Sequence, residues 1–156
     1  MTVRAERRPS EGPTHSLRHR GREAAVQMLY QWEIGRASIT DVAETFWFHD
    51  DCQELTVSDT DHRMFARTLA VGVADNVGNL DPVIVEAAEN WRIERMNVVD
   101  RLILRLAVYE FLHERATPSR VIINEALELA RTFSDADSVR FVNGILDAVR
   151  ARLERE

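Results

Sequence analysis

The spacing of apolar residues decides the fold class of this 156-residue chain, because they recur every three or four positions from residue 16 almost to the end. That interval matches the α-helical repeat and places the apolar side chains on one face of each helix. Strand-type alternation bounded by turn residues is missing from the sequence. The pair Asn143-Gly144 lies inside a helical pattern, where we expect a close packing point and not a hairpin. The chain is therefore predicted to be all-α.

Three helices are expected in the first half of the chain. The first runs over 16–35, where Gly35 supplies a C-terminal stop signal. A short second helix begins at Ser38. A long third helix, capped by Ser58 or Asp59, is expected to end at residue 78.

The second half is expected to hold four helices. Asp81-Pro82 is a start signal, because proline is tolerated at the first helical position, and it predicts a fourth helix over 83–91. Asn97 opens a fifth helix, whose nearly continuous apolar set indicates a central helix buried on more than one side. The last three predicted helices occupy the segments 97–112, 121–130 and 141–153.

Seven helices with short loops favour two small fused helical bundles. We predict an N-terminal helical subdomain over 16–80 and a C-terminal helical subdomain over 81–156. Residues 1–15 combine prolines and a glycine with charged residues, a composition too polar to order itself, and are predicted to be a flexible basic arm.

Charge is distributed unevenly along the chain, whose net charge is -6. Residues 1–22 contain six arginines and two acidic residues, a net +4, so the remainder carries -10. A basic arm on an acidic body is typical of chains whose arm meets nucleic acid, although a solvated tail has the same composition. A single cysteine, no apolar run of about 20 residues and no signal-peptide pattern predict a cytoplasmic protein without a membrane partner.

Catalytic chemistry is not indicated. The run His49-Asp50-Asp51-Cys52 offers four adjacent potential ligands, but neighbouring side chains rarely converge on one ion, so no metal is expected. Nucleophile settings and glycine-rich phosphate loops are missing, so we expect neither an enzyme nor a cofactor.

Recognition of single-stranded RNA is the activity that the residues favour. Such RNA is held by basic surfaces that follow its phosphates and by aromatic rings that stack on its bases. The first helix offers both, with Arg18, Arg20 and Arg22 about two to three turns before Tyr30. Taken alone, Tyr30 is also compatible with a core position.

Three stretches resemble the NusB family of transcription antitermination factors: 18–32 (RHRGREAAVQMLYQW), 121–130 (VIINEALELA) and 137–147 (DSVRFVNGILD). The segment 100–105 (DRLILR) before Tyr109-Glu110 matches too. The resemblance covers residues 18–152. It departs from the family where His19 and Gly21 interrupt a denser arginine block, for which Arg4, Arg7 and Arg8 could compensate.

The resemblance implies a two-subdomain helical fold and a function. It implies binding of boxA RNA from ribosomal RNA transcripts as a heterodimer with the ribosomal protein NusE, followed by assembly with RNA polymerase and other Nus factors. It also implies a homodimer of the free protein in some members. The residues implied to bind RNA are Arg18, Arg20, Arg22, Gln27, Tyr30, Asp137, Ser138, Arg140 and Phe141, and those implied to bind the partner protein are Glu94, Asp100 and Arg101.

The start of the last helix is also a plausible phosphate site on physical grounds, because helix N-termini present free N–H groups. There are three rival interpretations. One is a helical adaptor that does not bind RNA, and another is an RNA-binding module related to ribosomal RNA cytosine methyltransferases. A helix-turn-helix DNA-binding protein is disfavoured by the acidic body and by the lack of a basic recognition helix.

Overall fold

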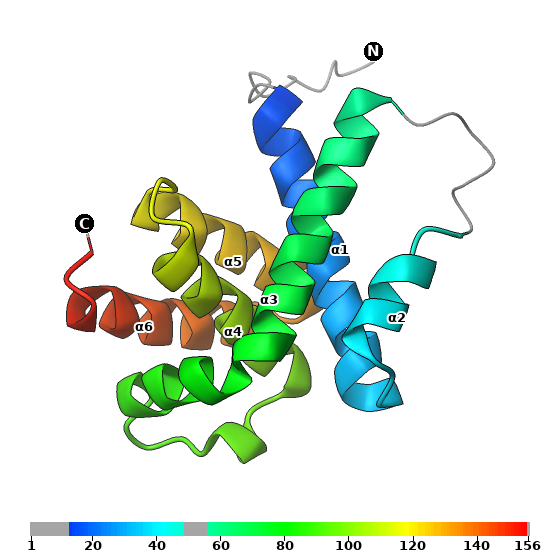
Figure 1. Ribbon diagram of the computed structural model, residues 1–156. Coiled ribbons are helices and arrows are strands. Elements are labelled where there is room, and N and C mark those ends of the chain that lie inside the picture. The colour runs from blue at the N-terminus through cyan, green and yellow to red at the C-terminus, as the bar shows by residue number, and fades with distance from the viewer. Residues whose placement is uncertain (1–12, 49–55, 156) are drawn as a thin grey trace, which may run out of the picture.

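A computed structural model describes residues 13–48 and 56–155, and within these ranges it contains six α-helices, the short 3-10 helix η2 and no strand (Figure 1). The all-α prediction is confirmed. Residues 1–12 of the predicted arm lie outside the described residues, and helix starts three residues before the predicted residue 16. The elements are α1 (Pro13–Gly35), α2 (Ile39–Thr45), α3 (Val57–Ala87), η2 (Ile93–Arg95), α4 (Val98–His113), α5 (Ser119–Phe133) and α6 (Ala136–Arg152).

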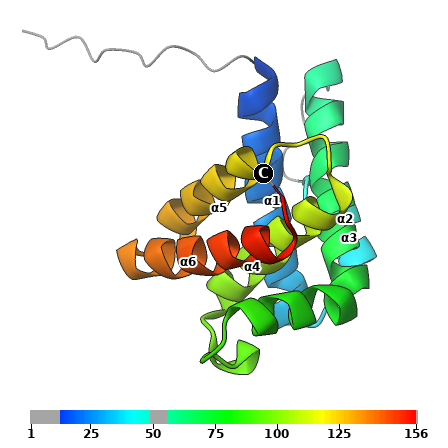
Figure 2. The same ribbon diagram turned by 90° about the vertical axis from the view of Figure 1, so that its left-hand side faces the viewer.

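The predicted break between the third and fourth helices is wrong, because α3 continues through Pro82. A proline inside a helix removes one backbone hydrogen bond and bends the axis, and α3 changes direction partway along its length (Figures 1 and 2). Asp81 does not cap a new helix, since both its carboxylate oxygens accept hydrogen bonds of 2.8 Å from Arg105 in α4. The predicted subdomain boundary thus falls inside α3, and the division at residue 80 stays a prediction.

Two helix starts show how local sequence fixes the elements. Asn97 caps α4 as predicted, its side chain accepting the backbone N–H of Val99 at 2.8 Å. The cap of α3 is Thr56, in place of the predicted Ser58 or Asp59. Asp59 instead completes a capping box, in which it accepts the backbone N–H of Thr56 and Thr56 accepts that of Asp59, both at 3.1 Å.

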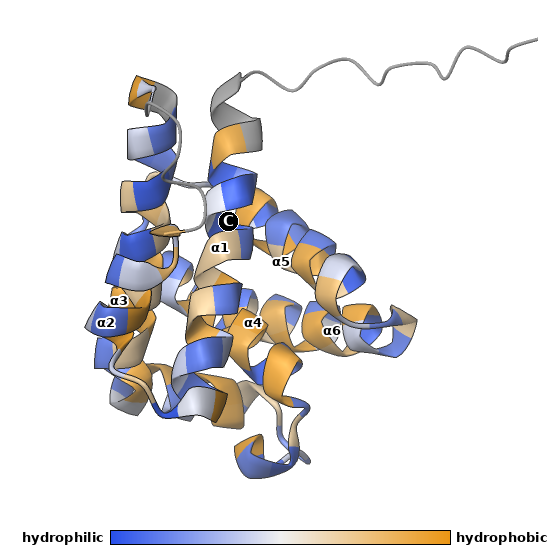
Figure 3. Cartoon of the chain, turned by 90° about the vertical axis from the view of Figure 1, so that its right-hand side faces the viewer, coloured by the Kyte–Doolittle hydropathy of each residue, from blue (hydrophilic) through white to orange (hydrophobic). Residues whose placement is uncertain are grey.

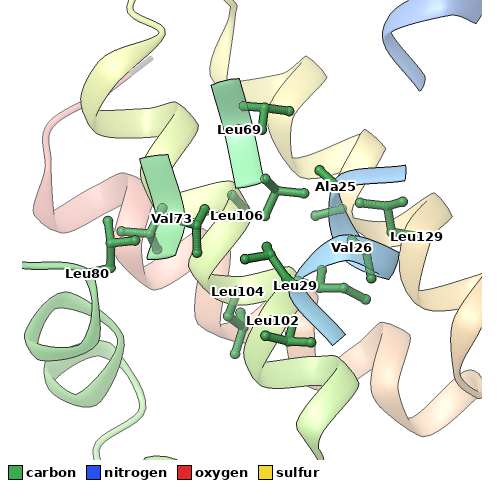
Figure 4. Close-up of a cluster of buried hydrophobic side chains, with 14 of the residues drawn as sticks. Ala25, Val26, Leu29, Leu69, Val73, Leu80, Leu102, Leu104, Leu106 and Leu129 are labelled. Carbon is green, nitrogen blue, oxygen red and sulfur yellow. The ribbon is translucent and has the colours of Figure 1, made fainter. Parts of the chain in front are cut away.

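The packing is organised around α4. Helices α1 and α3 lie side by side and run in the same direction, while α4, α5 and α6 pack together against this pair, with α4 in contact with both α1 and α3 (Figures 1 and 2). Residues 102–108 of α4 are all buried, which confirms the predicted central helix. Figure 4 shows side chains from α1, α3, α4 and α5 meeting in one cluster, among them Ala25, Val26, Leu29, Leu69, Val73, Leu102, Leu104, Leu106 and Leu129.

Glycines allow α1 and α4 to approach α3 closely. A Cβ atom at Gly21 would lie 2.7 Å from the Phe65 ring, and one at Gly72 would lie 2.3 Å from Tyr109. Gly21 therefore interrupts the arginines of α1 for a packing reason. The predicted close approach at Gly144 is wrong, because that position is exposed and faces open space.

Hydrophobic and hydrophilic residues interchange along every helix, as expected for helices that each bury one face (Figure 3). None of the helices in the described residues is both long and apolar enough to cross a membrane.

Candidate nucleic-acid interface

The first helix presents four of the predicted RNA-binding side chains to solvent. Arg18, Arg20, Gln27 and Tyr30 are all exposed along α1, and 45% of Tyr30 is accessible. The guanidinium of Arg18 lies 4.8 Å from the centroid of the Phe65 ring in α3, which holds this cation at the surface. The exposure of Tyr30 argues against the alternative core position. One helix thus carries two cations, an amide and an aromatic ring over about three turns.

Arg22 is the exception, because its side chain is 2% exposed. It makes a two-pronged hydrogen bond to Glu110 of α4, with Nη2 2.7 Å from Oε1, and its Nη1 lies 4.0 Å from Glu125 of α5. A buried guanidinium that already has a carboxylate partner cannot reach a phosphate without leaving an unpaired buried charge behind. The structure therefore corrects the implied surface role of Arg22: it ties α1 to α4.

His19 connects the same helix to α5. Its two ring nitrogens lie 2.6 Å from carboxylate oxygens of Glu23 and Glu125. Partial burial lowers the pKa of the imidazole, but the hydrogen bonds and negative charges of Glu125 and Glu23 outweigh burial and raise the pKa above 6.5. The imidazolium form is favoured, because only that form can donate to both carboxylates.

The first turns of α6 carry the other predicted RNA-binding residues. Asp137 and Arg140 are exposed and pair with each other, and the half-buried Phe141 meets Trp91 edge-on with ring centroids 5.3 Å apart. Trp91 itself is 55% exposed, so the two rings form an aromatic surface next to the helix start.

A backbone N–H group in the first turn of α6 already has a hydrogen-bond partner within the protein. The side chain of Asp135 caps α6 and accepts the N–H of Ser138 at 2.8 Å. An acidic cap satisfies that N–H and places a negative charge where a phosphate would sit, so the predicted phosphate site at this terminus is not supported.

Two neighbouring residues of α4 connect the predicted RNA-binding residues of α1 with those of α6. Arg101 donates to Glu33 of α1 at 2.8 Å, one turn beyond Tyr30, and Asp100 accepts a hydrogen bond of 3.0 Å from the hydroxyl of Ser138 in α6. The start of α4 thus links the C-terminal part of α1 with the first turn of α6.

These contacts change the expected roles of the implied partner residues. Asp100 is buried, and burial raises the pKa of its carboxyl group although the Ser138 hydroxyl acts in the opposite direction. Ser138 is buried as well, so neither side chain offers a free surface. Arg101 is half-buried and also donates to the Ile93 carbonyl at 3.3 Å. Glu94, in η2, is the one of the three implied partner residues that is exposed.

The residues that the structure describes hold no group of three or more side chains suited to a metal ion. The run His49-Asp50-Asp51-Cys52 lies outside them.

Sequence reasoning missed Glu110, Glu33 and Trp91, each of which contacts a predicted residue from a distant part of the chain. Contacts between residues 50 or more positions apart leave no local pattern in one sequence. The burial of Arg22 did leave a signal, because Arg22, Ala25 and Leu29 follow one another at intervals of three and four.

The chain is similar to known proteins of one family. A model of the NusB family matches residues 19–151. A protein of Koribacter versatilis named transcription antitermination protein NusB is 43% identical over 139 residues, which is 89% of this chain and 92% of that protein. A protein of the same name from Treponema denticola is 37% identical over 133 residues, or 85% of this chain and 95% of that protein.

Solved structures agree. The structure of T. maritima NusB superimposes with a TM-score of 0.74 at 34% identity, covering 86% of this chain and 90% of that one. The NusB-type chain in a structure of antitermination factors NusB and NusE in complex with dsRNA gives a TM-score of 0.76 at 20% identity, covering 88% and 98%. At that identity the second likeness speaks for the fold alone.

Proposed function

The chain belongs to the NusB family, and from this premise we propose that it is an RNA-binding transcription antitermination factor. Its ligand is single-stranded boxA RNA of ribosomal RNA transcripts, which it binds in the cytoplasm together with the ribosomal protein NusE. The pair then joins RNA polymerase and other Nus factors. In this role the protein needs neither a catalytic group nor a cofactor.

The observation that carries the proposal is the exposed series Arg18, Arg20, Gln27 and Tyr30 on α1. Planar guanidinium groups suit phosphate oxygens, and an exposed tyrosine ring suits a splayed base. The body of the protein is acidic, so a polyanion is repelled elsewhere and directed to this helix.

The aromatic surface of Phe141 and Trp91 next to Arg140 supports a second contact with the same strand. The start of α4 holds α1 and α6 in position through the contacts of Arg101 with Glu33 and of Asp100 with Ser138. Glu94 is the exposed acidic side chain among the three implied partner residues, and it can face a basic partner protein. Neither group alone offers more than a few phosphate or stacking contacts, so we propose that tight binding requires NusE.

A binding titration tests this function. A short boxA-like RNA is titrated with the full chain, with and without NusE, at low and moderate salt, alongside a scrambled RNA of equal length. We expect NusE to tighten binding of the boxA-like RNA only, and added salt to weaken it.

Equal and weak binding to both RNAs in all conditions would contradict the proposal. Binding of NusE without any effect on RNA would favour the adaptor interpretation instead, in which α1 only adds charge to the surface.

A further inference from the structure

A groove between α1, α2 and α3 is lined in part by two of the proposed RNA-binding residues, Arg20 and Gln27, and extends beyond them to residues that the proposed function does not use. It encloses about 400 Å³ and is open to solvent. Arg20, Gln27 and Gln31 line it from α1, Phe46 and Trp47 from the turn that follows α2, and His62 from α3. The volume falls within the range of roughly 300–1,000 Å³ that is usual for small organic ligands.

One wall of the groove is aromatic and held in place. The Trp47 ring meets Phe46 edge-on at 4.8 Å between centroids and meets His62 edge-on at 5.3 Å. The guanidinium of Arg63 lies 4.8 Å from the centroid of the Trp47 ring. A fixed indole at the side of an open groove suits stacking with a flat ligand ring.

The opposite wall carries hydrogen-bonding groups. Gln27 and Gln31 are both exposed and one helical turn apart, so their amides project into the same space. Each amide can donate and accept, as the edge of a nucleobase requires. Arg20 adds a cation one to two turns before Gln27. The acidic residue of this wall, Glu23, is held by His19 at 2.6 Å, which offsets its charge.

His62 supplies an independent indication of a ligand. Its side chain lines the groove and is only 7% exposed, yet its Nδ1 has no hydrogen-bond partner among the described residues. Buried polar atoms are nearly always paired, so an unpaired one marks a place that water or a ligand group completes.

We propose that this groove receives one unstacked base of the bound RNA, which stacks against Trp47 and is read by Gln27 and Gln31. The inference rests on the proposed function and adds a base-specific site to it. A protein segment is a poorer fit, because the groove combines amides, a guanidinium and one aromatic wall with little aliphatic surface.

An abasic scan tests the inference. In the presence of NusE, RNAs that lack one base at a time are titrated against the unmodified chain and against the Gln31→Ala and Trp47→Leu variants. The unmodified chain should lose about tenfold in affinity at one RNA position, a usual cost for one stacked base. In both variants the intact RNA should bind about tenfold more weakly, and removing that same base should cost nothing further.

Thr68→Ala, at an exposed position of α3 outside the groove, is the matched control and should keep the unmodified profile. Because Gln31 is exposed, its variant keeps the fold even if Trp47→Leu does not. An unchanged abasic profile in Gln31→Ala would overturn the inference while leaving the proposed function intact.

Two other results would also overturn it. A loss of NusE affinity in the variants, with an unchanged abasic profile, would make the groove a protein-binding surface. If the unmodified chain with NusE bound no RNA at all, the proposed function would fail together with the base site.

Discussion

Arg22 and Glu110, which lie 88 residues apart in the sequence, form a buried pair in which the arginine Nε is 3.1 Å from both carboxylate oxygens. The pair joins α1 to α4 inside the core. It separates the arginines of α1 into two kinds: Arg18 and Arg20 at the surface, and Arg22 as an internal tie.

The first prediction concerns this separation. Arg22→Ala should lower the free energy of unfolding by about 3–5 kcal/mol, because it leaves the Glu110 charge buried and unpaired. Arg20→Ala, at an exposed position, should change it by less than about 0.5 kcal/mol. Urea denaturation followed by circular dichroism measures both. A double variant, Arg22→Met with Glu110→Leu, should recover much of the stability, and an Arg22→Ala protein as stable as the unmodified chain would refute the assignment.

The second prediction concerns the approach of α3 and α4. Gly72→Ala should destabilise the protein by about 1–3 kcal/mol, because the added methyl group would lie 2.3 Å from the Tyr109 ring. Gly144→Ala is the control, since this exposed position in α6 faces open space. It should stabilise the protein by up to about 1 kcal/mol, as alanine is a better helix former than glycine. Thermal unfolding of the two variants, measured in parallel, tests this prediction. A shift of both melting temperatures in the same direction would contradict it.

The sequence contained enough to predict the helices, because apolar spacing and caps such as Asn97 are local features. It misled at Asp81-Pro82, where the local start signal was overridden by a tertiary contact: Asp81 pairs with Arg105 and α3 bends instead of ending. The chemical nature of their side chains, together with the family resemblance, predicted Arg20 and Tyr30 as RNA-binding residues, and both are exposed. The groove could not be predicted, because Gln31, Trp47 and His62 come together only when α1, α2 and α3 pack.

The third prediction concerns pH. Because the folded-state pKa of His19 is raised above 6.5, its ion pairs contribute stability that is fully present below 6.5 and is lost as the pH rises through the folded-state pKa. The unfolding free energy of the unmodified chain should therefore fall relative to that of His19→Gln between pH 6 and 9. Urea unfolding across this range gives the difference at each pH, and a difference that does not vary with pH would show that His19 does not titrate in this way.

The fourth prediction concerns the start of α6. Phe141→Leu keeps an apolar side chain but removes the ring, so RNA affinity in the presence of NusE should fall by about 1–3 kcal/mol of binding free energy. Val139→Ala, at a half-buried neighbouring position, should leave RNA affinity nearly unchanged. Equal affinities for the Phe141→Leu variant and the unmodified chain would place the RNA elsewhere.

The central claim is that the exposed arginines of α1 bind RNA phosphates. The most direct test is the salt dependence of boxA-like RNA binding, with NusE present, for the unmodified chain and for Arg18→Ala with Arg20→Ala. We predict that the slope of log affinity against log salt becomes shallower by about 0.7 for each phosphate that the double variant no longer binds. An unchanged slope and affinity in the double variant would contradict the account.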